Sequence, residues 1–349
     1  MAGSQPDELD MLVGRMKSAS APLRDTLRDL HSRLAPITAG KVADYIPELA
    51  KADPRKFGLS VVTTAGVTVE VGDCTDQFTI QSVSKPFVFG LALEDLGIEA
   101  VLSKVGVEPT GEAFNSIVLD ETSNRPFNPL VNAGAIATAD LVQGADYPER
   151  VRRLLDTFGK YCGREVFIDN SVFLSERQTG HRNRAMAHLM RNFDMMSDRF
   201  EEALELYFQQ CSILVSAHDL AAMGATLANG GVNPVTGQRA ISAANVKYIL
   251  SIMLSCGMYN YAGEWAFRIG IPAKSGVGGG IVAVVPGVMG IGIYSPPLDA
   301  KGNSVRGVKA CSELAAQFGL HCFESHFAGP SIVDQFGATR TRGNSTKLV

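Results

Sequence analysis

The sequence reads Thr79-Ile80-Gln81-Ser82-Val83-Ser84-Lys85-Pro86-Phe87 where a predicted strand passes into a predicted helix. If the chain turns helical after Gln81, Ser82 and Lys85 lie on one face, about 5–6 Å apart at Cβ. A serine alone is a weak nucleophile, and a neighbouring base such as Lys85 would activate it by taking its proton. The spacing therefore indicates covalent acyl transfer, although about one Ser-x-x-Lys match is expected by chance in a chain of this length.

Length and composition are those of an ordinary globular protein. The chain has 349 residues, which favours one large two-part unit or two domains. With 46% hydrophobic and 19% charged residues, it can bury a sizeable core. Its net charge is −4 and it has no long basic run, so we expect no nucleic-acid partner.

No segment of the sequence has the pattern of a targeting signal or a membrane span. The first ten residues are acidic and lack an apolar run, which argues against a signal peptide. The longest apolar stretch, 281–294, is interrupted by Pro286-Gly287 and falls short of the roughly 18 residues of a membrane helix. The six cysteines include no Cys-x-x-Cys pair. We therefore expect reduced, mostly buried thiols in a cytoplasmic protein without a membrane partner.

Apolar spacing predicts strands towards both ends of the chain and helices between them. Strands are expected at 59–62, 67–71, 78–80, 265–269, 280–286 and 288–294. Helices are expected within 8–35 and at 87–96, 129–142, 148–161, 182–190, 200–210, 217–229 and 305–318. This order predicts an α/β (α+β) fold, in which both chain ends build one antiparallel sheet and an all-helical part is inserted.

The same patterns set the expected domain boundaries. Residues 1–30 form a helical N-terminal extension, and residues 31–327 form one domain. Its sheet part comprises about 31–85 and 262–327, and its helical part about 86–261. The tail 328–349 is rich in Gly, Ser, Thr and Arg and is expected to be disordered. Ser82 stands at the crossing between the two parts, where a cleft would form.

A second chemically suggestive segment is Lys274-Ser275-Gly276-Val277-Gly278-Gly279-Gly280. One interpretation is a glycine-rich turn before a strand. A phosphate-binding loop is excluded, because Ala273 stands where that motif requires a glycine. The functional interpretation is an edge strand of the Lys-Thr-Gly type, with Ser275 in place of threonine. Such a strand lines a Ser-x-x-Lys cleft and supplies backbone N–H groups to an oxyanion hole.

The other candidate residues form weaker patterns. The six histidines include no metal-binding spacing, so no metal is expected. A histidine-based triad stays open, although no Gly-x-Ser-x-Gly elbow accompanies any serine. The segment 125–135 has the pattern of a turn that caps a helix. Glu176 and Asn183 would share a solvated face if their helix were continuous.

Several segments together resemble the serine-dependent glutaminases, which have a β-lactamase-like (penicillin-binding-protein-like) fold. These segments are 43–50, 81–86, 128–136, 175–183, 207–212, 256–259 and 274–280. They occur in the family's order, and the match runs from about residue 37 to residue 326. The resemblance implies hydrolysis of L-glutamine to L-glutamate and ammonia through a γ-glutamyl ester on serine, without a cofactor. It also implies a bacterial short form without ankyrin repeats and a homodimer or homotetramer.

The resemblance implies a role for each matching residue. Ser82 would be the nucleophile and Lys85 its base, with Tyr45 and Tyr259 beside the serine. The backbone N–H groups of Ser82 and Val277 would form the oxyanion hole. The implied substrate pocket consists of Gln81, Ser82, Asn132, Glu176, Asn183, Tyr207, Tyr259 and Val277. In this pocket a carboxylate suits the substrate's α-ammonium group, and amide and phenol donors suit its α-carboxylate.

Two other functions stay open on the sequence. One is a serine β-lactamase or penicillin-binding acyltransferase. It is disfavoured because Tyr259-Asn260-Tyr261 does not match the Ser-Asp-Asn or Tyr-x-Asn middle motif of those enzymes. The other is an inactive glutamine-binding sensor, which the presence of Ser82, Lys85 and Tyr259 disfavours.

Overall fold

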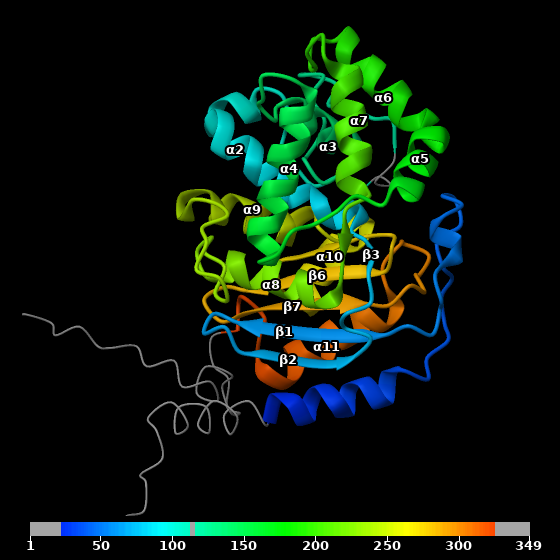
Figure 1. The fold of residues 1–349 in the computed structure, drawn as a ribbon, viewed down its shortest axis with the longest axis vertical. Helices are drawn as coiled ribbons and strands as arrows, with labels where there is room; N and C mark the ends of the chain where they lie inside the picture. Colours follow the sequence, from blue (N-terminus) through cyan, green and yellow to red (C-terminus); the bar gives the residue numbers. More distant parts are fainter. Residues whose placement is uncertain (1–21, 112–115, 325–349) are drawn as a thin grey trace, which may run out of the picture.

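A computed structural model describes residues 22–111 and 116–324 (Figure 1). A helix over residues 22–34 falls within the interval 8–35 that was predicted to be helical. The predictions for residues 1–21 and for the tail 328–349 lie outside the described residues.

A five-stranded antiparallel sheet is built from both ends of the chain, as predicted. Its order is β2-β1-β7-β6-β5. The strands are β1 (Gly58–Thr63), β2 (Thr68–Gly72), β5 (Ala273–Ser275), β6 (Gly280–Val285) and β7 (Met289–Tyr294). The two chain ends join where β1 pairs with β7, with Val61 opposite Ile291. The Lys274-Ser275 segment forms the edge strand β5, which is the position predicted for it.

Glycines let a helix lie unusually close to one face of this sheet. The helix α8 (Ala217–Ala228) crosses β7 at Gly290 and Gly292. A Cβ atom on Gly290 would lie only 2.2 Å from the Ala221 carbonyl oxygen, so no larger residue fits there. Although α8 belongs to the interval predicted as the helical part, it packs on the sheet (Figure 1).

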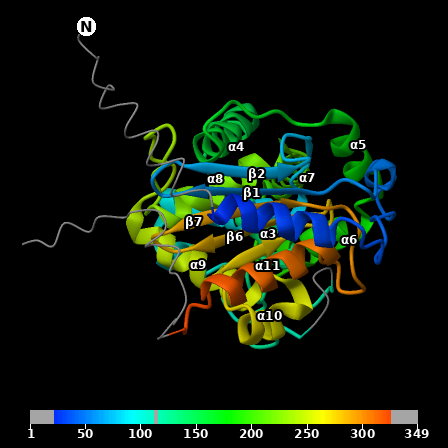
Figure 2. The ribbon, with the colours of Figure 1, turned by 90° about the horizontal axis from the view of Figure 1, so that it is seen from below.

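Three further helices cover the opposite face of the sheet (Figure 2). They are the helix over 22–34, α10 (Ala262–Arg268) and α11 (Val305–Phe318). Their apolar side chains, among them Leu27, Trp265 and Leu314, form one buried cluster with the inward-facing residues of the strands. Burial on both faces explains why every residue of β1, β6 and β7 is buried.

The remaining helices stand above the sheet in Figure 1 and pack mainly on one another. They are α2 (Lys85–Leu102), α3 (Asn132–Asp140), α4 (Tyr147–Cys162), α5 (Asn170–Thr179), α6 (His181–Asn192), α7 (Phe200–Cys211) and α9 (Ala243–Cys256). Phe87 of α2 packs edge-on against Tyr161 of α4 at 4.8 Å between ring centroids. Gly97, which directly follows the helix predicted at 87–96, has φ +75° and kinks α2 at that point.

Two predicted strands differ in the structure. The strand predicted at 265–269 is wrong, because these residues belong to α10 and its C-cap. Trp265 and Ile269 are buried four residues apart on one helix face, and Phe267 between them is 83% exposed. The strand predicted at 78–80 is shorter, and it does not join the large sheet. It forms β3 (Phe78–Thr79), which pairs with β4 (Leu214–Val215) in a separate two-stranded sheet.

The coarse prediction is therefore confirmed: the protein is a mixed α/β fold whose antiparallel sheet comes from both chain ends. The cysteines are all free thiols, and Cys322 alone among them is exposed. Within residues 22–111 and 116–324, no helix combines the length and apolarity needed to cross a bilayer.

Candidate active site

Ser82 lies in a short 3₁₀ turn, η2 (Gln81–Ser84), that runs directly into α2. Lys85 is the first residue of α2, and its backbone N–H donates to the Ser82 carbonyl. Residues three apart in a 3₁₀ turn eclipse one another, so this geometry stacks the lysine position on the serine position. Both residues are buried, with 6% of Ser82 and 1% of Lys85 exposed.

The residue before the serine has a strained backbone. Gln81 has φ +51°, in the left-handed region that non-glycine residues rarely occupy. The Ser84 hydroxyl donates to the Gln81 carbonyl at 2.7 Å, and the Gln210 side-chain amide donates to Ser84 Oγ at 3.2 Å. Strained conformations of this kind persist only where their surroundings fix them, and they concentrate at functional sites.

The Lys85 amine is held by neutral acceptors. Its Nζ donates to Asn132 Oδ1 at 2.7 Å and to the Leu130 carbonyl at 3.1 Å. Burial lowers the pKa of Lys85 to about 8, and the charge of Glu176 opposes that change. A lysine with this pKa is neutral in a sizeable fraction of molecules near neutral pH, so it can accept a proton.

A cavity of about 170 Å³ lies in front of Ser82. Seven of the predicted site residues line it: Tyr45, Gln81, Ser82, Asn132, Glu176, Asn183 and Tyr207. The wall also includes residues to which the sequence analysis gave no role, namely Ile46, Thr179, Gly180, Arg182 and Cys211. All five fall within the family-like segments 43–50, 175–183 and 207–212, which was the one available signal for them.

Glu176 reaches the cavity because its helix is broken. Glu176 and Asn183 lie on two helices, α5 and α6, which are separated at Gly180, so the condition of one continuous helix is not met. Glu176 is only 6% exposed, which excludes the alternative of a solvated face for this residue. Its Oε1 has no hydrogen-bond partner among the described residues. Burial raises the pKa of Glu176 to about 7, against lowering contributions from Gln81 and Lys85.

Two amides link the helices on either side of the cavity. Asn132, at the start of α3, donates through Nδ2 to Asn183 Oδ1 of α6 at 3.1 Å. The preceding turn is shaped by Asn128, whose Oδ1 accepts from the N–H groups of Leu130 and Val131. The segment 125–135 is thus the predicted turn before a helix, and it also places Asn132 against Lys85.

The glycine-rich segment lies directly against the serine turn. A Cβ atom on Gly276 would lie 2.9 Å from the Ile80 carbonyl oxygen, so only glycine allows this approach. Val277 packs in one buried cluster with Tyr259 and Ile46. Tyr259 begins η3 (Tyr259–Tyr261) with φ +56°, a second strained backbone at the site. Burial raises the pKa of Tyr259, and the neighbouring Ser82 opposes that effect.

Three predicted residues do not line the 170 Å³ cavity itself. Lys85 lies behind its wall, in contact with Asn132. Tyr259 and Val277 border two neighbouring hollows of about 510 and 920 Å³. Tyr45 is 54% exposed and lines both the inner cavity and the larger hollow, so it stands at the mouth of the site.

The sequence analysis assigned no role to the amine of Lys274. This side chain is fully buried, and its Nζ donates to the Ser275 carbonyl at 2.6 Å. The same Nζ lies 4.1 Å from the centroid of the Tyr259 ring. Burial, with a smaller contribution from Lys85, holds the pKa of Lys274 well below its ordinary value. The Lys-Ser-Gly motif was the available signal, but it pointed to the strand and not to the amine.

The described part of the chain, 22–111 and 116–324, contains no group of three or more His, Cys, Asp or Glu side chains that could hold a metal ion.

The fold and the site together are those of a hydrolase, with a serine, a lysine of lowered pKa and a buried acid around one small cavity. The family model Glutaminase matches residues 40–323, and the chain belongs to the glutaminase family. A glutaminase from Trichormus variabilis is 61% identical over 311 residues, which cover 89% of this chain and 93% of that protein. One from Microcystis aeruginosa is 63% identical over 302 residues, covering 86% and 89%.

Solved structures agree with this assignment. A structure described as the probable glutaminase ybaS has a TM-score of 0.84 at 43% identity, and the match covers 86% of this chain and 98% of that chain. A structure of Mglu in its glutamate form has a TM-score of 0.84 at 43% identity, covering 88% of this chain and 71% of that chain.

Proposed function

We propose that this glutaminase cleaves the side-chain amide of L-glutamine through a γ-glutamyl ester on Ser82. The neutral Lys85 amine takes the Ser82 proton while Oγ bonds to the side-chain carbonyl carbon, giving a tetrahedral oxyanion. The C–N bond then breaks, the nitrogen takes the proton that Lys85 accepted, and ammonia leaves with Lys85 neutral again. Water next attacks the ester and passes a proton to Lys85; the ester C–O bond breaks, Ser82 Oγ takes that proton back, and L-glutamate is released.

The observation that carries this proposal is the pairing of Ser82 with a buried lysine whose pKa is about 8. A lysine with its ordinary pKa of 10.5 would be almost wholly protonated at neutral pH and could not act as a base. Its acceptors, Asn132 and the Leu130 carbonyl, are uncharged and so do not trap the proton as a carboxylate would.

The neighbouring groups supply the remaining chemistry. Tyr259, which lies beside Ser82, is placed to pass a proton to the departing nitrogen, and Tyr45 closes the site from the solvent side. The backbone N–H groups of Ser82 and Val277 form the oxyanion hole, which is supported by the contact of the glycine-rich segment with the serine turn.

The cavity wall accounts for selection of a free amino acid. Glu176 presents a buried carboxylate oxygen that has no hydrogen-bond partner within residues 22–111 and 116–324, which suits the α-ammonium group of the substrate. Asn132, Asn183, Tyr207 and Gln81 add donors around it for the α-carboxylate and the side-chain amide. Mglu, a structural relative, is described in a glutamate form, which agrees with a site that also holds the product.

We also propose three broader features. The fold is of the β-lactamase-like type, supported by the antiparallel sheet and the Ser-x-x-Lys turn that opens α2. Residues 31–327 act as one catalytic domain, in which α8 packs with the sheet part rather than with the helical part. The protein assembles as a homodimer or homotetramer in the cytoplasm, and sedimentation of the purified chain tests that assembly.

Release of ammonia from L-glutamine tests the proposed reaction. The wild type should release ammonia, and Ser82→Ala should not. Equal activity in the two proteins would rule out Ser82 as the nucleophile. Nitrocefin and L-asparagine serve as comparison substrates, because rapid nitrocefin turnover without ammonia from glutamine would instead identify a β-lactamase. Glutamine binding by the wild type without any turnover would identify a sensor.

A further inference from the structure

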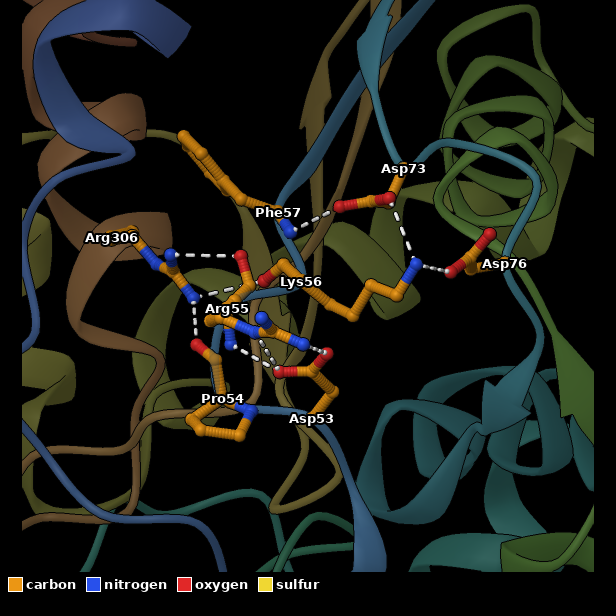
Figure 3. A network of polar contacts seen from close by, with 8 residues as sticks. All are labelled: Asp53, Pro54, Arg55, Lys56, Phe57, Asp73, Asp76 and Arg306. Carbon is orange, nitrogen blue, oxygen red and sulfur yellow. Dashed lines mark hydrogen bonds and ion pairs between the residues drawn. The ribbon is translucent and has the colours of Figure 1, made fainter.

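One buried arginine bridges the two ends of the segment that carries Tyr45. Arg306 stands near the start of α11 and is only 2% exposed. Its guanidinium donates to the carbonyl of Ala35, directly after the helix over 22–34. It also donates to the carbonyls of Pro54, Arg55 and Lys56, directly before β1. Residues 36–53, which include Tyr45, therefore leave and re-enter the fold at one side chain. Figure 3 shows the contacts of Arg306 with residues 54–56.

The guanidinium uses its full hydrogen-bonding capacity for this purpose. Nε donates to Ser295 Oγ at 2.8 Å, Nη1 to two carbonyls at 3.4 and 3.3 Å, and Nη2 to two carbonyls at 2.6 and 2.9 Å. Arginine has five N–H donors in a rigid planar fork, and all five have partners here. A lysine has three donors on one atom and cannot reach the same acceptors together. The site is therefore specific for arginine.

The position of this charge is electrostatically unfavourable, so packing alone does not explain it. Arg306 lies in the first turn of α11, where the helix dipole repels a cation. All of its hydrogen-bond acceptors are neutral, and its one ring contact places the guanidinium 5.2 Å over Phe57. A fully buried, unpaired charge is costly. The hydrogen bonds of Arg306 with the backbone carbonyls offset this cost and hold those carbonyls together.

The segment held in this way reaches the active site directly. Ala43, Ile46 and Leu49 pack with Tyr259, Val277 and Leu298 in one buried cluster. Lys41 and Leu298 exchange two backbone hydrogen bonds, at 3.0 and 2.8 Å, and Lys41 lies about midway between Ala35 and Tyr45 in the sequence. Tyr45 itself lines the cavity in front of Ser82. Loops longer than about 12–15 residues are uncommon in compact domains and need such anchors to keep one conformation.

Residues 54–57 also contact the part of the chain that leads to Ser82. Lys56 Nζ forms ion pairs with Asp73 at 3.1 Å and Asp76 at 2.6 Å, and the Phe57 N–H donates to Asp73 (Figure 3). Residues 73–77 connect β2 to β3, which leads into the turn that bears Ser82. The same short stretch, 54–57, is thus fixed both to the Tyr45 segment and to the chain that approaches Ser82.

We propose that Arg306 is a positioning residue for catalysis, which holds the two ends of residues 36–53 so that Tyr45 and Ile46 stay against the Ser82 cavity. This inference rests on the proposed function, because it assigns Tyr45 a place in glutamine turnover. Arg306 touches no substrate and acts through Tyr45.

A double-mutant cycle in the full chain tests the inference. Arg306→Lys should lower kcat/KM for glutamine about tenfold or more when Tyr45 is present, because small misplacements are costly in catalysis. In a Tyr45→Ala background the same change should cost less than about threefold, since the residue it positions is gone. Equal factors in the two backgrounds would show a purely structural role and overturn the proposal. Unchanged kcat/KM in Arg306→Lys would overturn it as well.

A matched variant separates positioning from general loss of stability. Arg150 is also a fully buried arginine, and its guanidinium donates to the carbonyls of Ala139 and Val142 among the helices above the sheet. Arg150→Lys should lower Tm while kcat/KM, measured well below Tm, stays within about twofold. If Arg306→Lys does not fold, Ser295→Ala removes one acceptor and should give the same dependence on Tyr45 at a smaller size. A loss of equal size with and without Tyr45 would again overturn the proposal.

Hydrogen exchange tests, without any substrate, whether Arg306 holds the two ends of residues 36–53. Backbone amides within 36–53 should exchange about tenfold faster in Arg306→Lys than in the wild type, and at the wild-type rate in Arg150→Lys. Unchanged exchange in Arg306→Lys would overturn the proposal that Arg306 holds this segment. Faster exchange in a protein whose wild type releases no ammonia would overturn the proposed function alone.

Discussion

The Nζ atom of Lys274 lies 4.1 Å from the centroid of the Tyr259 ring, in the interior of the protein. The lysine comes from the edge strand β5, and the tyrosine begins η3 with a left-handed backbone. Through this contact the Lys274-Ser275-Gly276 segment meets the tyrosine that lies beside Ser82. Burial holds the pKa of Lys274 well below its ordinary value, so a neutral amine is favoured beside the ring.

Lys274→Met should lower activity without lowering stability. The change keeps the volume of the side chain and removes the amine beside Tyr259, so we expect kcat to fall about 10- to 100-fold. Tm should stay equal or rise, because burying a thioether costs less than burying an amine. Steady-state kinetics and thermal unfolding check both parts. Lys309→Met, at an exposed lysine, is the control, and full activity in Lys274→Met would contradict the role.

Ser82→Ala and Lys85→Ala should each lower kcat by several orders of magnitude, and the double variant should lose no more than either single one. A nucleophile and its base act as one unit, so their effects do not add. Ammonia release measured over long incubations provides the test. Ser251→Ala, which removes an exposed hydroxyl, should match the wild type. Additive losses in the double variant would show that Lys85 does not act through Ser82.

Asn132→Asp should move the pH dependence of the reaction upwards. Lys85 must be neutral to act, so in the wild type kcat/KM should rise as pH passes through about 8. A carboxylate at position 132 would lie where Oδ1 now accepts from Lys85 Nζ at 2.7 Å and would favour the ammonium form. The acid limb of the profile should then move about 1 to 3 pH units higher. The exposed Asn260→Asp should leave the profile in place; an unmoved profile in Asn132→Asp would exclude Lys85 as the base.

Glu176→Gln should weaken substrate binding and yet stabilise the folded protein above pH 7. Losing the partner of the α-ammonium group should raise KM about 10- to 100-fold. The folded pKa of Glu176 is raised from 4.5 to about 7, so its contribution to stability is present below pH 4.5 and is lost as pH rises through 7. This loss of folding free energy is roughly 3 kcal/mol at most, and the neutral side chain of Glu176→Gln avoids it.

Thermal unfolding at several pH values checks this effect of Glu176. The Tm gain of Glu176→Gln should be largest near pH 8 and should vanish near pH 4.5. A gain that does not vary with pH would contradict the raised pKa. Glu201→Gln, on the exposed first turn of α7, should show neither the gain nor the change in KM.

Local sequence patterns predicted much of the fold. Apolar runs at 59–62, 67–71, 280–286 and 288–294 predicted the strands that form the hairpins β1-β2 and β6-β7, because strand patterns are properties of neighbouring residues. The pattern failed at 265–269. Trp265 and Ile269 are four residues apart, a spacing that fits both the two-residue period of a strand and the i, i+4 spacing of a helix. Packing of these side chains against the sheet selected the helix.

The sequence by itself determined the Ser82 to Lys85 spacing, the alternation of strands and helices, and the family, because each is encoded in residue order. Only the tertiary structure decided the chemistry of the pair. Desolvation by residues distant in sequence lowers the pKa of Lys85 and raises that of Glu176, and no local pattern records which groups exclude water. The same holds for Arg306, whose carbonyl partners lie some 250 positions away along the chain.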